Sequence, residues 1–289
     1  MKRIMNLGLT AMTLAAFVLA SCTKDDDVVQ KWQRKHLLSE TCEYTTNDGV
    51  AHKDVTEHKY DERWNCIEKV YLRDGKDGDK EQYKYNSRGN IEEMTSLYND
   101  TIIYVLKYEY DDSDNLLREF YFYRDEQSAS GTAEYTHEGD SVEIVYQGGQ
   151  LFKKTTTQLE GNIETVCSFY YSQGECHESV QSKTVYNDSN RDKILTSEKT
   201  YSSPNGKIKE LYDAETEEMI NFPFTIKSEY TYNETGNLVG FVSFRNGKLI
   251  EERKDYVYDG STVTYTQYYY WNSSDTPSSI RYYTLVYAD

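Results

Sequence analysis

The residues best suited to chemistry in this chain are its histidines and cysteines, and their spacing predicts no catalytic centre. The five histidines are scattered, at His36, His52, His58, His137 and His177. No His-Glu-x-x-His, Gly-x-Ser-x-Gly or phosphate-binding glycine loop is present, so the patterns that place a zinc ion, a serine nucleophile or a nucleotide are missing. The sequence therefore predicts that the protein is not an enzyme and holds no metal or cofactor.

Four cysteines in the body of the chain form an even set: Cys42, Cys66, Cys167 and Cys176. In an exported protein such a set suggests disulfides. Cys167 and Cys176 flank a turn at residues 172–174, and Cys42 and Cys66 would join neighbouring strands, so these are the two candidate disulfides. The alternative is that all four thiols are small buried hydrophobic groups.

Cys22 ends a targeting segment. A short basic start precedes Ile4–Val18, which carries no charge, and this arrangement is typical of a secretory signal peptide. The run Leu19-Ala20-Ser21-Cys22 resembles the lipobox of bacterial lipoproteins, which implies cleavage before Cys22 and lipidation of its thiol. The predicted organisation is a signal peptide at 1–21, an acidic tether at 22–30 and a single β-repeat domain at 31–289.

The charged run after Cys22 refines the predicted destination. Lys24-Asp25-Asp26-Asp27 resembles the surface-export signal of Bacteroidota lipoproteins. That resemblance implies an outer-membrane protein, lipid-anchored in the outer leaflet and exposed at the cell surface. The alternative is an ordinary solvated tether, since runs of like charge are usually disordered.

Tyrosine is the outlier of the composition, at 29 of 289 residues, whereas proline occurs only 3 times. Tyrosine favours strands and suits surfaces that are partly exposed to solvent. Exposed rings could stack on a ligand, and the candidate ligand-stacking aromatics are Tyr121, Tyr123, Tyr268, Tyr270 and Trp271. The alternative is that these rings only cover a thin sheet.

A repeated phrase indicates how these side chains are positioned. Tyr83-Lys84-Tyr85-Asn86-Ser87-Arg88-Gly89-Asn90-Ile91 recurs at 108–116 and 230–238, with weaker copies at 58–66 and 155–163. Two tyrosines end a strand, Asn86 caps a turn, and Gly89 takes the left-handed position before the return strand. Trp64 stands at the glycine position of the first copy, so that copy is expected to turn differently.

Each period of about 25 residues is predicted to be one antiparallel hairpin, which gives roughly twenty strands in all. The second turn of a period carries signals such as Asp74-Gly75 and Asn246-Gly247. Residues 213–220 could instead form one or two helical turns. The predicted fold class is all-β, an antiparallel meander of two-strand repeats in a curled or coiled sheet.

The phrase Tyr-x-Tyr-[Asp/Asn]-x-x-Gly-Asn-[Ile/Leu] resembles the YD repeat of the RHS family over most of residues 55–265. In that family the repeats form a long antiparallel strip that spirals into a shell or decorates cell surfaces. This chain lacks the C-terminal core and toxin domain expected there. The resemblance is therefore to degenerate YD/RHS-like repeats in a Bacteroidota-type surface lipoprotein.

Charge limits the partners. The net charge of −17 repels nucleic acid and anionic head groups, so no nucleic-acid partner is predicted. The leading hypothesis is a surface binding or adhesion module that presents its strip to a glycan or protein, with the membrane contacted through the lipid. The alternatives are a structural envelope spacer or assembly component and a hydrolase, since 49 acidic residues supply carboxylate pairs anywhere.

Overall fold

The protein is all-β in the computed structural model, which describes residues 36–46, 49–124, 128–137, 142–188, 191, 193–206, 210–213, 218–270 and 276–288. The strands are β1 Leu37–Thr45, β2 Ala51–Tyr60, β3 Cys66–Arg73, β4 Lys76–Tyr85, β5 Ile91–Tyr98, β6 Thr101–Tyr110, β7 Leu116–Tyr123, β8 Gly131–His137, β9 Val142–Gln147, β10 Gln150–Glu160, β11 Ile163–Ser172, β12 Glu175–Tyr186, β13 Ile194–Ser202, β14 Glu210–Asp213, β15 Glu218–Asn221, β16 Phe224–Tyr232, β17 Leu238–Arg245, β18 Lys248–Asp259, β19 Thr262–Tyr269 and β20 Ser279–Tyr287.

None of these described residues belongs to a helix, and so none of them forms a helix long and apolar enough to cross a membrane. The alternative of helical turns at residues 213–220 does not hold at the described ends of that segment. Asp213 belongs to β14 and residues 218–220 belong to β15, and in this short hairpin Leu211 pairs with Ile220 and Tyr212 with Met219. Residues 214–217 lie outside the described residues.

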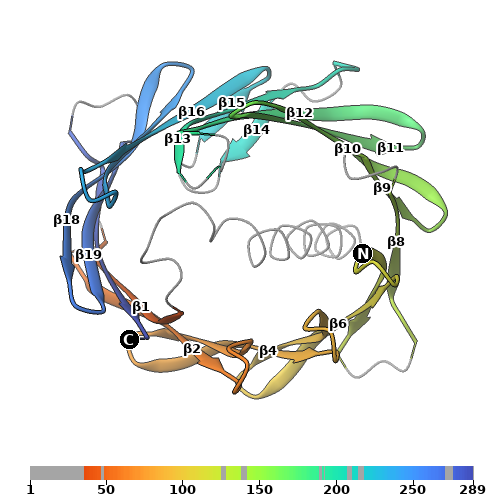
Figure 1. Cartoon of the computed structure of the whole chain (residues 1–289), viewed down its shortest axis with the longest axis horizontal. Helices are drawn as coiled ribbons and strands as arrows, with labels where there is room; N and C mark the ends of the chain where they lie inside the picture. Colours follow the sequence, from red (N-terminus) through yellow and green to blue (C-terminus); the bar gives the residue numbers. More distant parts are fainter. Residues whose placement is uncertain are drawn as a thin grey trace.

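Eighteen of the strands form one antiparallel sheet that closes on itself. Each strand from β1 to β13 pairs with the next, β13 pairs with β16, and the meander continues to β20. The last strand then pairs with the first along Glu40–Leu285, Cys42–Tyr283 and Tyr44–Arg281. Figure 1 looks down the resulting ring. The expected curled strip therefore has no free edges, because closure pairs the edge strands with each other.

The turns of the repeated phrase form as predicted. In the copy at 83–91 the Asn86 side chain accepts the backbone N–H groups of Arg88 and Asn90, both at 3.0 Å, and Gly89 has φ +92°. Asn246 and Gly247 likewise both have positive φ in the β17–β18 turn. Left-handed residues at these positions match the right-handed twist of the flanking strands.

The first copy of the phrase makes the same turn, so the expectation that it turns differently is wrong. Asp61 accepts the N–H groups of Arg63 and Asn65 at 2.8 Å each. The side-chain amide of Asn65 also donates to Asp61 at 2.9 Å, and this bond, together with the backbone bonds, holds the pKa of the Asp61 carboxyl below the usual range. Trp64 takes the left-handed position with φ 64°. Its indole stacks on His36, with ring centroids 4.6 Å apart. Stacking of this kind offsets backbone strain.

The second tyrosine of the phrase, at the position of Tyr85, makes a hydrogen bond that recurs along the barrel. Its hydroxyl donates to the backbone carbonyl of the first residue of a strand in the neighbouring repeat. We call this the cross-repeat hydrogen bond. The pairs are Tyr60 to Leu37, Tyr85 to Cys66, Tyr110 to Ile91, Tyr232 to Ile194 and Tyr258 to Leu238, at 2.7–3.0 Å. A structural bond therefore accounts for these tyrosines.

Loss of one cross-repeat hydrogen bond should lower stability measurably. Tyr110→Phe leaves the Ile91 carbonyl without this donor, and we expect the free energy of unfolding to fall by about 1 kcal/mol. Tyr108→Phe is the matched control, because the Tyr108 hydroxyl has no partner among the described residues and its loss should be neutral or stabilising. Urea denaturation of both variants checks this; equal losses would contradict it.

Candidate functional site

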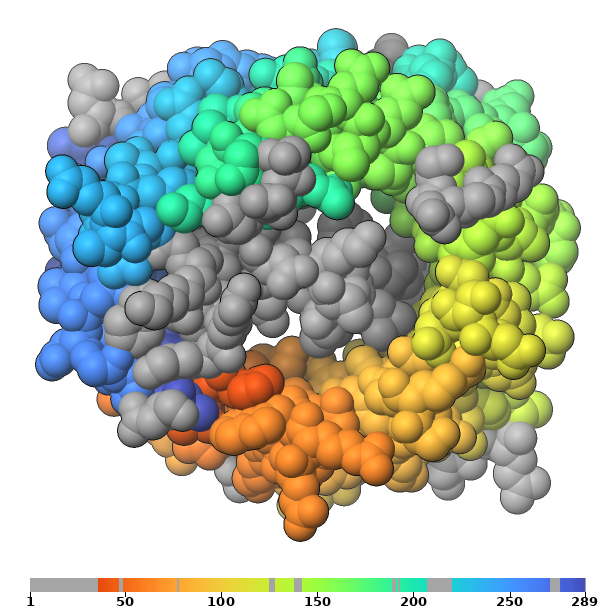
Figure 2. Space-filling view, viewed as in Figure 1, coloured from red at the N-terminus to blue at the C-terminus, as the bar shows by residue number. Residues whose placement is uncertain are grey.

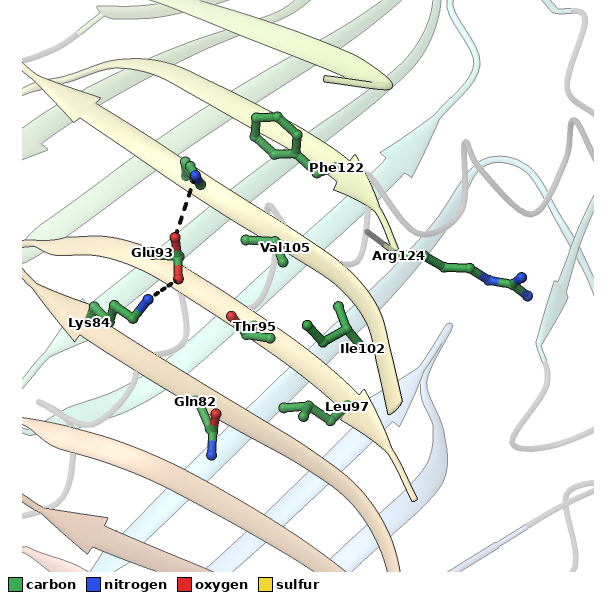
Figure 3. Close-up of a pocket in the computed structure, with 10 residues that line it drawn as sticks. Gln82, Lys84, Glu93, Thr95, Leu97, Ile102, Val105, Phe122 and Arg124 are labelled. Atoms are coloured by element: carbon green, nitrogen blue, oxygen red, sulfur yellow. Dashed lines mark hydrogen bonds and ion pairs between the residues drawn. The ribbon is translucent and has the colours of Figure 1, made fainter. Parts of the chain in front are cut away.

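The barrel has an outer and an inner face, because side chains alternate along each strand. Figure 3 views β4 to β7 from outside, with the opposite wall behind them, and Lys84, Glu93 and Phe122 rise from the near face. The alternate side chains point to the inside of the ring, which we call the bore. Tyr83 and Leu106 there are only 6 % and 0 % exposed, whereas the Lys84 side chain is 73 % exposed.

The outer face of the barrel carries ion pairs on β1 to β7, on β16 and on β18. Lysine and arginine side chains pair with glutamates on the same or adjacent strands. These pairs are Lys53–Glu43, Lys59–Glu68, Lys84–Glu93, Lys107–Glu93, Arg118–Glu109, Lys227–Glu229 and Lys254–Glu252, at 2.5–3.7 Å. Exposed ion pairs contribute little to stability, but they indicate a surface that contacts water.

A shallow depression of about 570 Å³ lies on the outer face of β4 to β7. Its floor carries the apolar side chains Leu97, Ile102, Val105 and Phe122 (Figure 3). Lysines at its rim are neutralised by Glu93, which lies between Lys84 and Lys107. The depression offers no convergent set of unpaired polar groups, so it does not qualify as the functional site.

The bore is lined by tyrosines interspersed with charged groups. In the space-filling view the described side chains form a ring (Figure 2). Barrels of 16 to 18 strands are wide enough to leave an aqueous channel. Lys199 supports an accessible interior, since it faces the bore between Ser182 and Ile226 and is exposed.

One part of the bore wall is a stack of tyrosine rings with two arginines. Tyr265 on β19 stacks on Tyr283 at 4.8 Å and on Tyr256 at 5.0 Å. Arg253 lies over the Phe241 ring at 4.7 Å and forms an ion pair with Glu251 at 2.6 Å. The second arginine, Arg281, lies over the Tyr269 ring at 4.9 Å. Burial raises the pKa of the tyrosine hydroxyls in this stack, so they remain neutral donors.

The other part of the wall centres on Glu119. This carboxyl on β7 lies opposite Tyr108 on β6 and Ala133 on β8 and is 6 % exposed. Burial raises its pKa to about 7, although a hydrogen bond from Tyr135 lowers it. Glu119 is therefore a carboxyl that changes charge near neutral pH inside an aromatic wall.

The raised pKa of Glu119 predicts a particular pH dependence of stability. The folded protein holds the proton up to about pH 7, whereas the unfolded chain releases it near the ordinary glutamate pKa of 4.5. Stability should therefore fall as pH rises between these values, by on the order of 2 kcal/mol. Glu119→Gln should lack this decline. Urea denaturation at several pH values checks it, and parallel curves for both proteins would contradict the assignment.

The predicted ligand-stacking aromatics are not brought together. Tyr121 packs against the bore-side cluster around Leu106, and Tyr123 shares that face because it pairs with Tyr104. Tyr268 and Tyr270 lie on the outer face beside Lys254 and Glu252. Trp271 lies outside the described residues. The described candidates therefore do not share one face of the barrel.

Neither candidate disulfide forms among the described residues, which include all four body cysteines. Cys167 lies opposite Gln181, while Cys176 lies opposite Tyr171, so the two are out of register across their hairpin. Cys42 on β1 and Cys66 on β3 are separated by β2. Cys22, the signal peptide and the tether lie outside the described residues and remain predictions.

The functional residues that sequence reasoning missed are Glu119, Tyr108 and the arginines of the tyrosine stack. Each lies on the same face of its strand as the phrase tyrosines. Counting alternate residues along each strand could have found them, because a charged residue on the same face as buried tyrosines is unusual. Among the described residues no group of three metal-ligating side chains comes together.

No protein-family model matches this chain, and no curated protein matches it either. Among solved structures it is similar to a porin-like protein from Bacteroides vulgatus ATCC 8482, with 11 % identity and a TM-score of 0.38 over 88 % of this chain and 99 % of that one. It is also similar to a porin-like protein from Bacteroides uniformis ATCC 8492, with 7 % identity and a TM-score of 0.42 over 87 % and 98 %. Identities and TM-scores this low carry nothing about function.

Two interpretations of the sequence are corrected here. The assignment to YD/RHS-like repeats is wrong, because the hairpins close into an 18-stranded barrel and form no open strip. The hypothesis of an adhesion module that presents an aromatic strip to a glycan or protein is also wrong. Closure turns most tyrosines of the repeat inward, so the strip and its exposed ring row are absent from the described chain.

Proposed function

We propose that this protein is an open-ended chamber for small solutes, held at the outer membrane by lipid on Cys22, with the bore as its working surface. The observation that carries the proposal is the outer face, where lysines and arginines form exposed ion pairs, together with a bore lined by tyrosines and interspersed charged groups. A lipid-facing strand needs apolar outward side chains, because a lysine or arginine at the bilayer midplane costs about 2–4 kcal/mol. Ion pairs such as Lys84–Glu93 and Lys227–Glu229 therefore favour water around the barrel.

The position of the tether supports an orientation. Leu37 begins β1 at the end of the barrel that also holds the turns after Tyr60, Tyr85 and Tyr110. The residues between Cys22 and that end span at most roughly 50 Å when extended. In the proposed arrangement this end faces the membrane, and the end with the Asn246–Gly247 turn opens away from it. The run after Cys22 favours the outer leaflet at the cell surface.

Cysteine accessibility tests the chamber. In mature protein whose four body cysteines are replaced by serine, Lys199→Cys places a thiol in the bore, and Lys227→Cys places one on the outer face of the next strand. A small methanethiosulfonate reagent should modify both. A maleimide on a long polyethylene glycol should modify only Lys227→Cys. Circular dichroism confirms that both variants fold.

Two results would overturn the proposal. A Lys199→Cys thiol that resists the small reagent would mean a sealed bore. Release of an entrapped dye from lipid vesicles by the purified protein would replace the chamber with a membrane-spanning pore. Retention of the dye, together with size-limited labelling of Lys199→Cys, is the expected result.

A further inference from the structure

Two neighbouring residues on the bore wall each hold a buried polar atom that has no hydrogen-bond partner among the described residues. These atoms are the Tyr108 hydroxyl and the Oε2 atom of Glu119. The two residues are direct cross-strand partners on β6 and β7 and are only 4 % and 6 % exposed. An unpaired buried polar group costs on the order of 1–3 kcal/mol, so two adjacent ones point to a missing partner that binds both.

The surroundings define what that partner must be. Tyrosine rings gather on this wall: Tyr83, Tyr85, Tyr104, Tyr110 and Tyr121 belong to the cluster that contains Tyr108. None of the ion pairs in the described chain includes Glu119, and its one resolved side-chain bond comes from Tyr135. The wall therefore offers a carboxyl oxygen, a phenol oxygen and the negative faces of several rings.

We infer that this wall binds the head group of a primary alkylammonium ion, with Glu119 and Tyr108 accepting its N–H groups. Three donors on one cationic nitrogen satisfy both unpaired oxygens, and the surrounding ring faces attract the same charge. The alkyl tail packs against the rings, which offer apolar area. The net charge of −17 raises the local concentration of cations. This inference rests on the proposed chamber, because the ion reaches the wall from the bore.

Other candidates fit these groups less well. An anion would meet the carboxylate and the ring faces unfavourably. A neutral alcohol can accept from the Tyr108 hydroxyl and donate to Glu119, but it offers no charge to the carboxyl or to the ring faces. A buried water could bridge the two oxygens, and it would occupy the site with no selectivity for a cation. The experiment separates these cases.

The test is calorimetric titration of the mature protein with n-butylammonium, n-butanol and butyrate. We expect n-butylammonium to bind at a single site and the other two not to bind. Glu119→Gln should weaken n-butylammonium binding by at least about tenfold, and Tyr108→Phe should weaken it severalfold. Glu93→Gln is the matched control on the outer face and should bind as the parent does.

Each other outcome counts against the inference. Equal affinity in Glu119→Gln, or equal affinity for n-butanol, would show that a water molecule or the rings alone account for this wall. Absence of n-butylammonium binding while Lys199→Cys still reacts with the small reagent would refute the cation site and leave the chamber intact. An unreactive Lys199→Cys would instead refute the chamber itself.

Discussion

A disulfide between residues 41 and 284 is expected to form on oxidation and to raise the free energy of unfolding by about 5 kcal/mol. Thr41 on β1 and Thr284 on β20 are register partners on the outer face, although they come from opposite ends of the barrel sequence. A bond between them closes a loop of roughly 240 residues, and the stabilisation grows with loop length. The variant Thr41→Cys/Thr284→Cys, in the serine background, tests barrel closure directly.

The readouts are a mobility shift on non-reducing gels and a higher urea midpoint that returns to the parent value on reduction. Thr41→Cys with Thr264→Cys is the control, because Thr264 pairs with Thr284 and lies one strand further from β1. That pair should stay reduced. Failure of the 41–284 bond, or equal formation in the control, would show that β1 and β20 do not meet in the register described.

Leu106→Ala is expected to destabilise the barrel by about 2–5 kcal/mol. Leu106 is 0 % exposed and lies among Tyr83, Met94 and Tyr108, so its removal leaves a cavity that these rings cannot fill. Val105→Ala is the matched control one residue away on the outer face. It should lose less than about 1 kcal/mol, because Val105 borders the shallow depression and faces water.

Urea denaturation of both variants decides between two descriptions of the wall. A large loss at Leu106 with a small loss at Val105 supports a packed inner face and a solvated outer face. The opposite ranking would mean that the faces are assigned the wrong way round, and the chamber would then lose its main support.

The hairpins of this protein could be predicted from its sequence, because they depend on residues that are close together in the chain. The phrase around Tyr85 and Asn86 carries a strand end, a capped turn and a left-handed residue within nine positions, so the hairpin follows from local chemistry. Trp64 was misjudged because its stacking on His36 depends on a residue 28 positions away in the chain.

Closure and the two faces could not be predicted in the same way. The pairing of β1 with β20 is a contact between the two ends of the barrel, and a period-two pattern says which residues share a face without saying which face is inside. Tyr121 and Tyr268 are equally aromatic, yet closure places one in the bore and the other outside. Glu119 was missed because its place opposite Tyr108 depends on the register of β6 and β7.

The cross-repeat hydrogen bond also bears on how such a barrel changes size in evolution. Each bond, such as that from Tyr110 to Ile91, is made between one hairpin and its neighbour. Duplicating or deleting a whole hairpin therefore preserves every remaining bond and leaves no new donor unpaired. Because barrel diameter grows with strand number, gene duplication of this unit widens or narrows the lumen in steps of two strands, without redesign of the wall.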